Sequence, residues 1–129
     1  MASENNKSKI NRILRIYREN RPWGNFIQYT NNQTCTVKIM TVHPGEELSY
    51  QYHSKRDELW IPLTEGLEFI IEEQVMEPRI FEEIFLPCGI KHRARGTGTK
   101  PAQWLEISFG FFDENDIVRL KDKYKRKTE

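Results

Sequence analysis

Short apolar runs alternate with polar turns along most of the chain, from about residue 25 to residue 110. The runs are rich in β-branched and aromatic residues, and turn residues recur about every eight to twelve positions, a spacing typical of all-β sandwiches and barrels. The pattern therefore predicts an all-β domain. The predicted strands are NFIQYT, TCTVKIMTV, LSYQYH, DELWIPL, LEFIIEE, RIFEEIFL, HRARG and AQWLEISFG, with a hairpin turn at NNQ between the first two and another turn at HPGEE.

The N-terminal end has a different pattern. Residues 1–16 are mainly polar and are predicted to form a partly disordered arm, and the segment RPWG at residues 21–24 is predicted to interrupt the chain before the first strand. A short amphipathic helix in or beside this arm is the alternative, because four apolar residues recur there at helical spacing. They are Ile10, Ile13, Leu14 and Tyr17.

The segment after Gly110, DENDIVRLKDKYKRK, predicts a C-terminal helix. Asp113 or Asn115 can cap it, acidic residues fill its first turn and basic residues fill its last turn, as the helix dipole favours. The chain has no internal repeat or low-complexity stretch that would suggest a second domain. We therefore expect residues 17–129 to form one domain.

Length and charge narrow the function classes. With 129 residues and a net charge of +1, the chain is expected to be one modest domain without the strongly basic surface that nucleic-acid binding usually needs. It has no apolar run of the roughly 18–20 residues that span a bilayer, and its polar start, MASENNKSKINR, lacks the apolar core of a signal peptide. We therefore expect a cytoplasmic protein that binds neither nucleic acid nor membrane, with Cys35 and Cys88 as free thiols.

The stretch LSYQYHSKRDELW, residues 48–60, concentrates side chains that can bind a cation. Alternation along a strand puts Gln51 and His53 on one face. Glu58 can join them if the strands on either side of the turn SKR pair as a hairpin. His92 follows a Pro-x-Gly turn in LPCGIK, which would return a strand to the same end of a barrel. Amide, imidazole and carboxylate donors together suit a divalent metal; solvated or structural histidines are the alternative.

These residues match both motifs of the cupin pattern in order and spacing. The resemblance implies a single-domain cupin, which is a double-stranded β-helix or jelly-roll barrel, with one divalent metal. The alternative is a cupin that has kept the fold and lost the ion. The first motif corresponds to Gly45, Gln51, His53, Glu58 and Gly66, and the second to Pro87, Gly89 and His92. The implied metal ligands are Gln51, His53, Glu58 and His92.

A closer resemblance covers about residues 17–126. The segments RPWG, VKIMTVHPGEELSYQYHSKRDELW, LPCGIKHR and LEISFGFFDENDIVRLKDKYKR are similar to the type II mannose-6-phosphate isomerases. The same domain forms the C-terminal part of bifunctional mannose-1-phosphate guanylyltransferase/mannose-6-phosphate isomerases. The resemblance implies a metal-dependent aldose–ketose isomerase that interconverts mannose 6-phosphate and fructose 6-phosphate through an enediol or enediolate. In that family a glutamine commonly replaces the first cupin histidine, as Gln51 does here.

Some positions depart from the family pattern. Ser54, Lys55 and Leu59 stand where the family often has histidine, and Gly96 stands where the second cupin motif often has asparagine. These positions adjoin the implied ligands and bear on the choice of sugar. The segment GTGTKP, residues 96–101, looks like the glycine-rich signature of sugar nucleotidyltransferases, but it lies between two predicted strands near the end of the chain. We therefore predict a hairpin turn there and no GTP chemistry.

The isomerisation moves a proton between C2 and C1, so it needs a proton carrier as well as a metal. Glu106 is the first candidate. Alternation puts it on the strand face opposite Leu105 and Ile107, and the face of Glu106 could line the cavity. The family pattern also has glutamate at this position. Arg56 lies at the tip between the two ligand strands and should stand at the pocket mouth. There it could stabilise the enediolate or hold the substrate phosphate.

Further substrate-binding candidates are Arg119, which matches a family arginine, and Lys38 on the strand that contains VK. Structural interpretations stay open, because Glu106 could be an exposed charge on the barrel wall and Arg56 a solvated turn arginine. Three tryptophans are expected to pack in the core and at the rim rather than to stack on a sugar. They are Trp23, Trp60 and Trp104.

Four nitrogen and oxygen donors without a thiolate favour zinc, with manganese, cobalt, nickel or iron as alternatives. Two other functions stay open: a non-catalytic sugar- or metal-binding cupin and a metal-dependent dioxygenase. A dioxygenase usually presents two or three histidines, so Gln51 weighs against it. The expected partner is a phosphorylated sugar, and a homodimer is expected only by analogy with other cupins.

Overall fold

The computed structural model describes residues 16–124, whose regular structure consists entirely of strands. The all-β prediction is therefore confirmed. Over these residues no helix has the length and apolar character that crossing a membrane requires. The chain divides into two compact units, Met1–Gln33 and Thr34–Glu129, which are described separately. The expected domain start at residue 17 stays a prediction.

The first unit contains one antiparallel hairpin, formed by β1 (Tyr17–Arg21) and β2 (Gly24–Gln28). Arg21 lies opposite Gly24, so Pro22 and Trp23 form the loop, and the segment that we expected to be a break is a hairpin turn. The predicted hairpin at NNQ is wrong, because β2 pairs with β1 and not with the following strand. The alternative N-terminal helix lies almost entirely outside the described residues.

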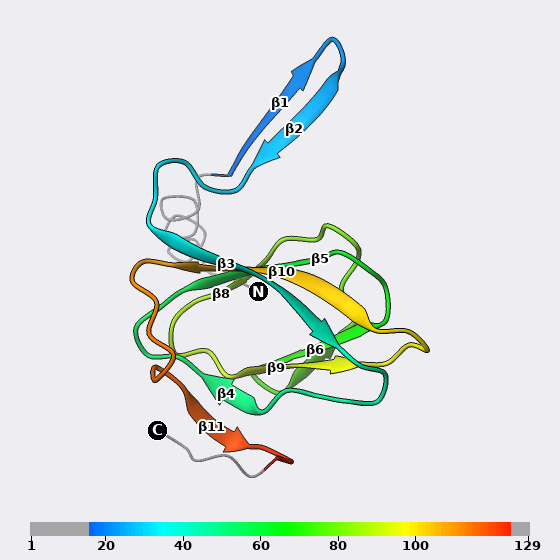
Figure 1. Ribbon diagram of the computed structural model, residues 1–129, viewed down its shortest axis with the longest axis vertical. Helices are drawn as coiled ribbons and strands as arrows, with labels where there is room; N and C mark the ends of the chain where they lie inside the picture. Colours follow the sequence, from blue (N-terminus) through cyan, green and yellow to red (C-terminus); the bar gives the residue numbers. More distant parts are fainter. Residues whose placement is uncertain (1–15, 125–129) are drawn as a thin grey trace. The chain divides into compact units, whose positions relative to one another are not determined.

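The second unit contains two antiparallel sheets, which lie face to face (Figure 1). One sheet has the order β3-β10-β5-β8 and the other has the order β11-β4-β9-β6-β7. The strands of the first sheet are β3 (Cys35–Val42), β10 (Ala102–Phe109), β5 (Glu58–Pro62) and β8 (Ile84–Leu86). Those of the second are β11 (Val118–Lys121), β4 (Tyr50–Tyr52), β9 (His92–Gly96), β6 (Leu67–Ile71) and β7 (Gln74–Met76).

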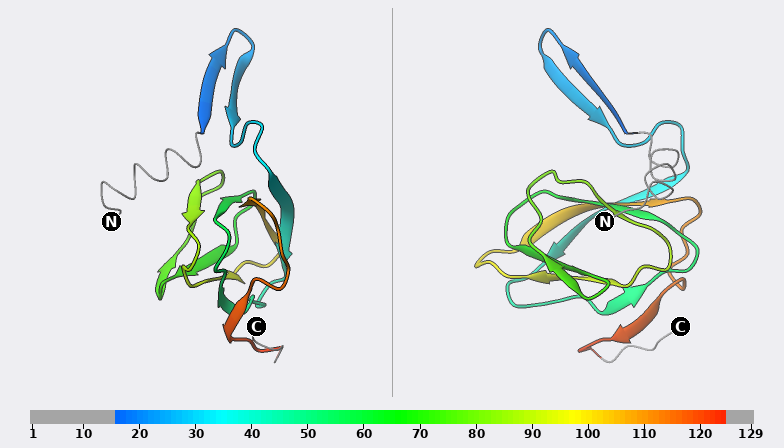
Figure 2. Two further views of the ribbon diagram at one scale, coloured as in Figure 1. Left: turned by 90° about the vertical axis from the view of Figure 1, so that its left-hand side faces the viewer. Right: turned by 180° about the vertical axis from the view of Figure 1, so that it is seen from behind.

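The hydrophobic core lies between the two sheets, whose layers can also be followed in Figure 2. Trp60, Trp104 and Phe69 form its centre, with ring centroids 5.0–5.8 Å apart, so Trp60 and Trp104 are packing residues as expected. The smaller core residues are Val42, Leu67, Ile84, Leu86, Ala94 and Ala102. Among the described residues, strand pairing does not join the two sheets into the closed barrel that we expected.

Two predicted hairpins are instead connections between the sheets. The strands on either side of SKR, β4 and β5, belong to different sheets, and so do β9 and β10 on either side of GTGTKP. At the start of that second connection, a Cβ on Gly96 would lie 2.5 Å from the backbone oxygen of His43. The close approach of the two backbones therefore explains the glycine at this departure from the cupin motif.

The predicted C-terminal helix is wrong over residues 113–124; residues 125–129 lie outside the described part. Asp113 does not cap a helix, because none follows it within residues 113–124; its side chain accepts a hydrogen bond from the backbone N–H of Asn115 (2.9 Å) within a turn. The chain then enters β11, which pairs with β4. The sheet register puts Arg119 opposite Gln51, so this segment brings its side chains to the ligand strand.

Candidate metal centre and catalytic cavity

A cavity of about 460 Å³ opens on the residues that the sequence singled out. It is lined from both sheets and from the segment that precedes β11. Glu58 is the one predicted site residue outside the lining; it is only 1% exposed and contacts the cavity residues Arg56 and Trp60. The predicted site residues in the lining are Lys38, Gln51, His53, Arg56, His92, Glu106 and Arg119.

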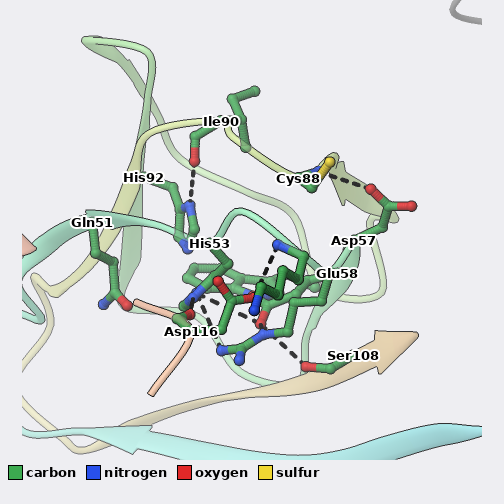
Figure 3. Close-up of polar contacts among 12 residues, drawn as sticks. Gln51, His53, Asp57, Glu58, Cys88, Ile90, His92, Ser108 and Asp116 are labelled. Atoms are coloured by element: carbon green, nitrogen blue, oxygen red, sulfur yellow. Dashed lines mark hydrogen bonds and ion pairs between the residues drawn. The ribbon is translucent and has the colours of Figure 1, made fainter. Parts of the chain in front are cut away.

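His53 and His92 present the same ring nitrogen to the site (Figure 3). His53 Nδ1 lies 2.7 Å from the backbone oxygen of Asp116, and His92 Nδ1 lies 2.9 Å from that of Ile90. A carbonyl can only accept, so each Nδ1 carries the hydrogen and each Nε2 keeps a lone pair. The backbone N–H of Gly89, in the predicted Pro-x-Gly turn, donates to the backbone oxygen of His53 (2.6 Å) and so joins the two ligand segments.

Burial keeps both imidazoles neutral. It lowers the pKa of His53 and lowers the pKa of His92 to about 4, and in each case it outweighs the attraction of Glu58 for the protonated ring. At neutral pH both rings therefore offer a lone pair, as a metal ligand must. Among residues 16–124, His92 Nε2 is buried and has no hydrogen-bond partner. A buried polar atom without a partner is costly, and a metal at this position would satisfy it.

Glu58 lies at the start of β5, with its carboxylate held from three sides. Trp60 Nε1 donates to Oε1 (3.0 Å), while Ser108 Oγ and Arg56 Nε donate to Oε2 (3.1 and 2.7 Å). Burial opposes its ionisation, but the charge that either imidazole carries when it is protonated, together with the charge and hydrogen bond of the Arg56 guanidinium, outweighs that effect and holds the pKa of Glu58 below its usual value. With both rings neutral, Arg56 is the cation that stabilises the carboxylate. Glu58 is therefore a buried anion.

Donor atoms of His53, Glu58 and His92 all lie within 4.8 Å of one another. Two neutral imidazoles and one carboxylate are a donor set that suits zinc and related divalent metals, so the residues fit a metal site. Gln51 lies opposite His92 in the pairing of β4 with β9 and lines the same cavity. Its amide nitrogen donates to the backbone oxygen of Ser49 (3.3 Å), so its amide oxygen is the group that it can offer a metal.

Glu106 lies in the middle of β10, between Lys38 on β3 and Trp60 on β5. It lines the cavity and is 6% exposed, so it is not an exposed charge on the outer wall. Burial and then the negative charge of Glu58 raise the pKa of Glu106 to about 7. A carboxyl group with such a pKa can both release and take up a proton near neutral pH.

The structure excludes one interpretation of Arg56. It is 8% exposed and lies against the ligand cluster, so it is not a solvated turn residue. Three residues of the site were not expected: Ser108, which binds Glu58; Asp116, which binds His53; and Phe112, which contacts Arg56. Only Ser108 had a visible signal, since it alternates with Glu106 along one strand.

Asp116 also fixes the turn that follows His53. Its carboxylate accepts hydrogen bonds from the backbone N–H and hydroxyl of Ser54, both at 2.9 Å, and from the backbone N–H of Lys55 at 3.0 Å. The segment before β11 therefore orients a ligand and the turn beside it. This role was missed because the segment was predicted to be a helix.

Two facing antiparallel sheets with a buried imidazole–carboxylate cluster define a cupin-like protein. The chain belongs to the family described as "Mannose-6-phosphate isomerase C-terminal", whose model matches residues 5–122. The fold therefore agrees with the expected class, although no strand pairing joins the two sheets within residues 16–124.

The relatives are longer proteins of carbohydrate biosynthesis. "Xanthan biosynthesis protein XanB" of Xanthomonas campestris is 36% identical over 107 residues, which are 82% of this chain and 23% of that protein. A mannose-1-phosphate guanylyltransferase of Escherichia coli is 33% identical over 114 residues (87% and 24%), and "Alginate biosynthesis protein AlgA" of Pseudomonas putida is 32% identical over 124 residues (95% and 25%). The chain thus spans about a quarter of these proteins.

Solved structures support the fold alone. The capsular polysaccharide assembling protein CapF of Staphylococcus aureus has a TM-score of 0.60 at 15% identity, over 82% of this chain and 34% of that chain. Streptomyces PAC13 also has a TM-score of 0.60, at 13% identity, over 83% and 85% of the two chains.

Proposed function

We propose that this chain is a metal-dependent aldose–ketose isomerase that interconverts mannose 6-phosphate and fructose 6-phosphate through an enediol or enediolate. The observation that carries the proposal is the position of Glu106. Its carboxyl group, with a pKa raised to about 7, faces the same cavity as the buried cluster of His53, Glu58 and His92. A proton carrier next to a cation site is the minimum that such an isomerisation needs.

The ligands would be His53 Nε2, His92 Nε2, a carboxylate oxygen of Glu58 and the amide oxygen of Gln51. Held by these residues, a divalent metal would supply Lewis-acid stabilisation of the negative charge that develops on the sugar oxygens. Glu106 takes the proton from C2 of the open-chain aldose and returns it to C1, while the hydroxyl proton on O2 moves to O1. The net reaction therefore only moves hydrogen. The buried Trp60 and the partly buried Met40 provide an apolar part of the cavity wall, which would limit the access of water to this proton.

The substrate phosphate needs cationic partners at the cavity. Lys38 and Arg119 both line it, the first from β3 and the second from β11. We assign them to phosphate binding, because each can form charge-assisted hydrogen bonds with phosphate oxygens. Ser54, Lys55 and Leu59, which depart from the family pattern, adjoin the ligands and bear on the choice of sugar. The identity of the sugar is therefore proposed together with the reaction.

A coupled assay tests the activity. Protein loaded in turn with zinc, manganese, cobalt or nickel is mixed with mannose 6-phosphate, and fructose 6-phosphate is measured. We expect turnover with at least one of these metals and none after chelation. Absence of turnover with all of them would reject the isomerase proposal.

The ligand set has its own test. We expect His53→Ala and His92→Ala each to weaken zinc binding by at least about 100-fold, because loss of even a ligand's supporting partner typically costs about 10–100-fold. Equilibrium dialysis with metal analysis measures the effect. His43→Ala is the matched control, since His43 is an exposed histidine outside the cavity lining. If both ligand variants retain zinc as the control does, the ligand set is wrong.

A further inference from the structure

Arg56 makes a set of contacts unusual for a turn arginine. Its Nε donates to Glu58 Oε2 (2.7 Å), its Nη2 lies 3.3 Å from His53 Nε2, and its Nη1 donates to the backbone oxygen of Asp113 (3.1 Å). The guanidinium carbon lies 4.5 Å from the centre of the Phe112 ring. A buried cation is thus fixed against two of the three residues of the candidate metal cluster.

The guanidinium and a divalent metal would need the same atoms. A metal binds lone pairs, and His53 Nε2 and Glu58 Oε2 are the atoms that face the guanidinium. An arginine has no acceptor and keeps its charge at every pH that proteins tolerate, so it cannot share these lone pairs with a metal and would repel it. The remaining acceptor sites of Glu58 are also partly used, by Ser108 and Trp60.

We propose that Arg56 is the resident cation of this cluster and that it sets the metal affinity, since a divalent metal can bind His53 and Glu58 only when the guanidinium withdraws. The inference rests on the metal centre of the proposed function. The contacts of Arg56 with Asp113 and Phe112 do not involve the cluster, so they can hold the arginine side chain after it leaves Glu58. Because Arg56 also lines the cavity, the freed donors would then face an anionic group of the substrate.

The effect of the Arg56 guanidinium on the metal affinity has a sign that can be measured. If metal binding requires a minor arrangement of Arg56, the apparent dissociation constant equals the intrinsic constant divided by the fraction of protein that is competent to bind, so metal binding is weakened. Removing the guanidinium then removes this competition, and the metal should bind more tightly even though no ligand has changed. A residue that merely supports the fold would have the opposite effect or none.

The experiment measures the affinity for cobalt(II), by its visible spectrum and by calorimetry, in metal-free wild type and in Arg56→Met. We expect Arg56→Met to bind cobalt at least about tenfold more tightly, because one charge-assisted hydrogen bond is typically worth about a factor of ten or more. Lys38→Met is the matched control: Lys38 also lines the cavity and contacts Phe112. It removes the same charge without touching the cluster, and we expect less than a threefold change.

Three outcomes would overturn the inference: equal or weaker binding by Arg56→Met, an equal gain in Lys38→Met, or no binding in any variant. If Arg56→Met is unfolded without metal, its thermal unfolding is followed with added cobalt; recovery of the fold supports the inference and its failure contradicts it. The assay with mannose 6-phosphate is independent. An inactive protein that still shows the affinity difference would reject the isomerase proposal and support the role of Arg56. An active protein without the affinity difference would support the isomerase proposal and reject the role of Arg56.

Discussion

Replacement of Glu106 by glutamine is expected to lower kcat for the isomerisation by about a thousandfold, within the 10²–10⁴-fold range of general acid–base catalysis. Glutamine keeps the shape and polarity of the side chain but cannot carry a proton. KM should change little, because the substitution leaves the residues assigned to phosphate binding and the metal ligands unchanged. Fructose 6-phosphate formation gives kcat, and exchange of the C2 proton with deuterium from solvent shows whether the proton transfer itself is lost.

The pH dependence gives the same prediction a second, independent measurement. Burial and the charge of Glu58 raise the pKa of Glu106 to about 7. The carboxylate form must accept the C2 proton, so kcat/KM should fall about tenfold for each pH unit below that value and stay level above it. Any residual activity of Glu106→Gln should lack this slope.

The control for this prediction is Glu65→Gln, a substitution of the same chemical kind at an exposed position between β5 and β6. It should leave kcat and its pH profile unchanged. If Glu106→Gln retains more than a tenth of the wild-type kcat, another group carries the proton and the assignment is wrong.

The ligand residues could be predicted from the sequence because their signal is local. His53 and Glu58 lie five positions apart in the first motif, and a Pro-x-Gly turn fixes the approach of His92. The strand pattern also predicted most of β3 to β10, since alternation of side chains depends on neighbours in the sequence. That Glu106 could face the cavity followed from the same alternation, and the structure places Glu106 in the cavity lining.

The pairing of the strands could not be predicted, because it depends on residues far apart in the chain. The prediction brought Glu58 to His53 through a hairpin of β4 with β5, but these strands lie in facing sheets, and the ligands meet across the interior. The burial of Arg56 was missed for the same reason. Its environment comes from Asp113 and Phe112, more than fifty positions away in the sequence.

The C-terminal segment shows how local signals can mislead. Its acidic start and basic end suit a helix, yet the acids have other partners: Asp113 closes a turn and Asp116 binds the turn after His53. Val118 and Leu120 are two positions apart, and residues at this spacing share one face of a strand. Pairing with β4 provides hydrogen bonds for this backbone, and tertiary context decides between the two alternatives.

Replacement of Glu58 by glutamine is expected to lower the free energy of unfolding of the metal-free protein by about 3–5 kcal/mol, the range found when one partner of a buried ion pair is removed. Glu58 is 1% exposed, and the change leaves the Arg56 guanidinium buried without a counter-charge. Urea unfolding at pH 7 measures the loss. The matched control is Glu68→Gln, which removes a carboxylate from the partly exposed pair with Arg95 (3.0 Å) and should cost less than about 1 kcal/mol.

A double variant separates the lost charge pair from the altered packing. In Arg56→Met with Glu58→Gln neither partner is left as an unpaired buried charge, so the two changes together should destabilise the protein by less than the sum of their separate effects. Additive losses would contradict the pairing of these two residues in the core. A sub-additive result would mean that Glu58 is ionised because Arg56 neutralises it, and that the metal-free site is held together by its own arginine.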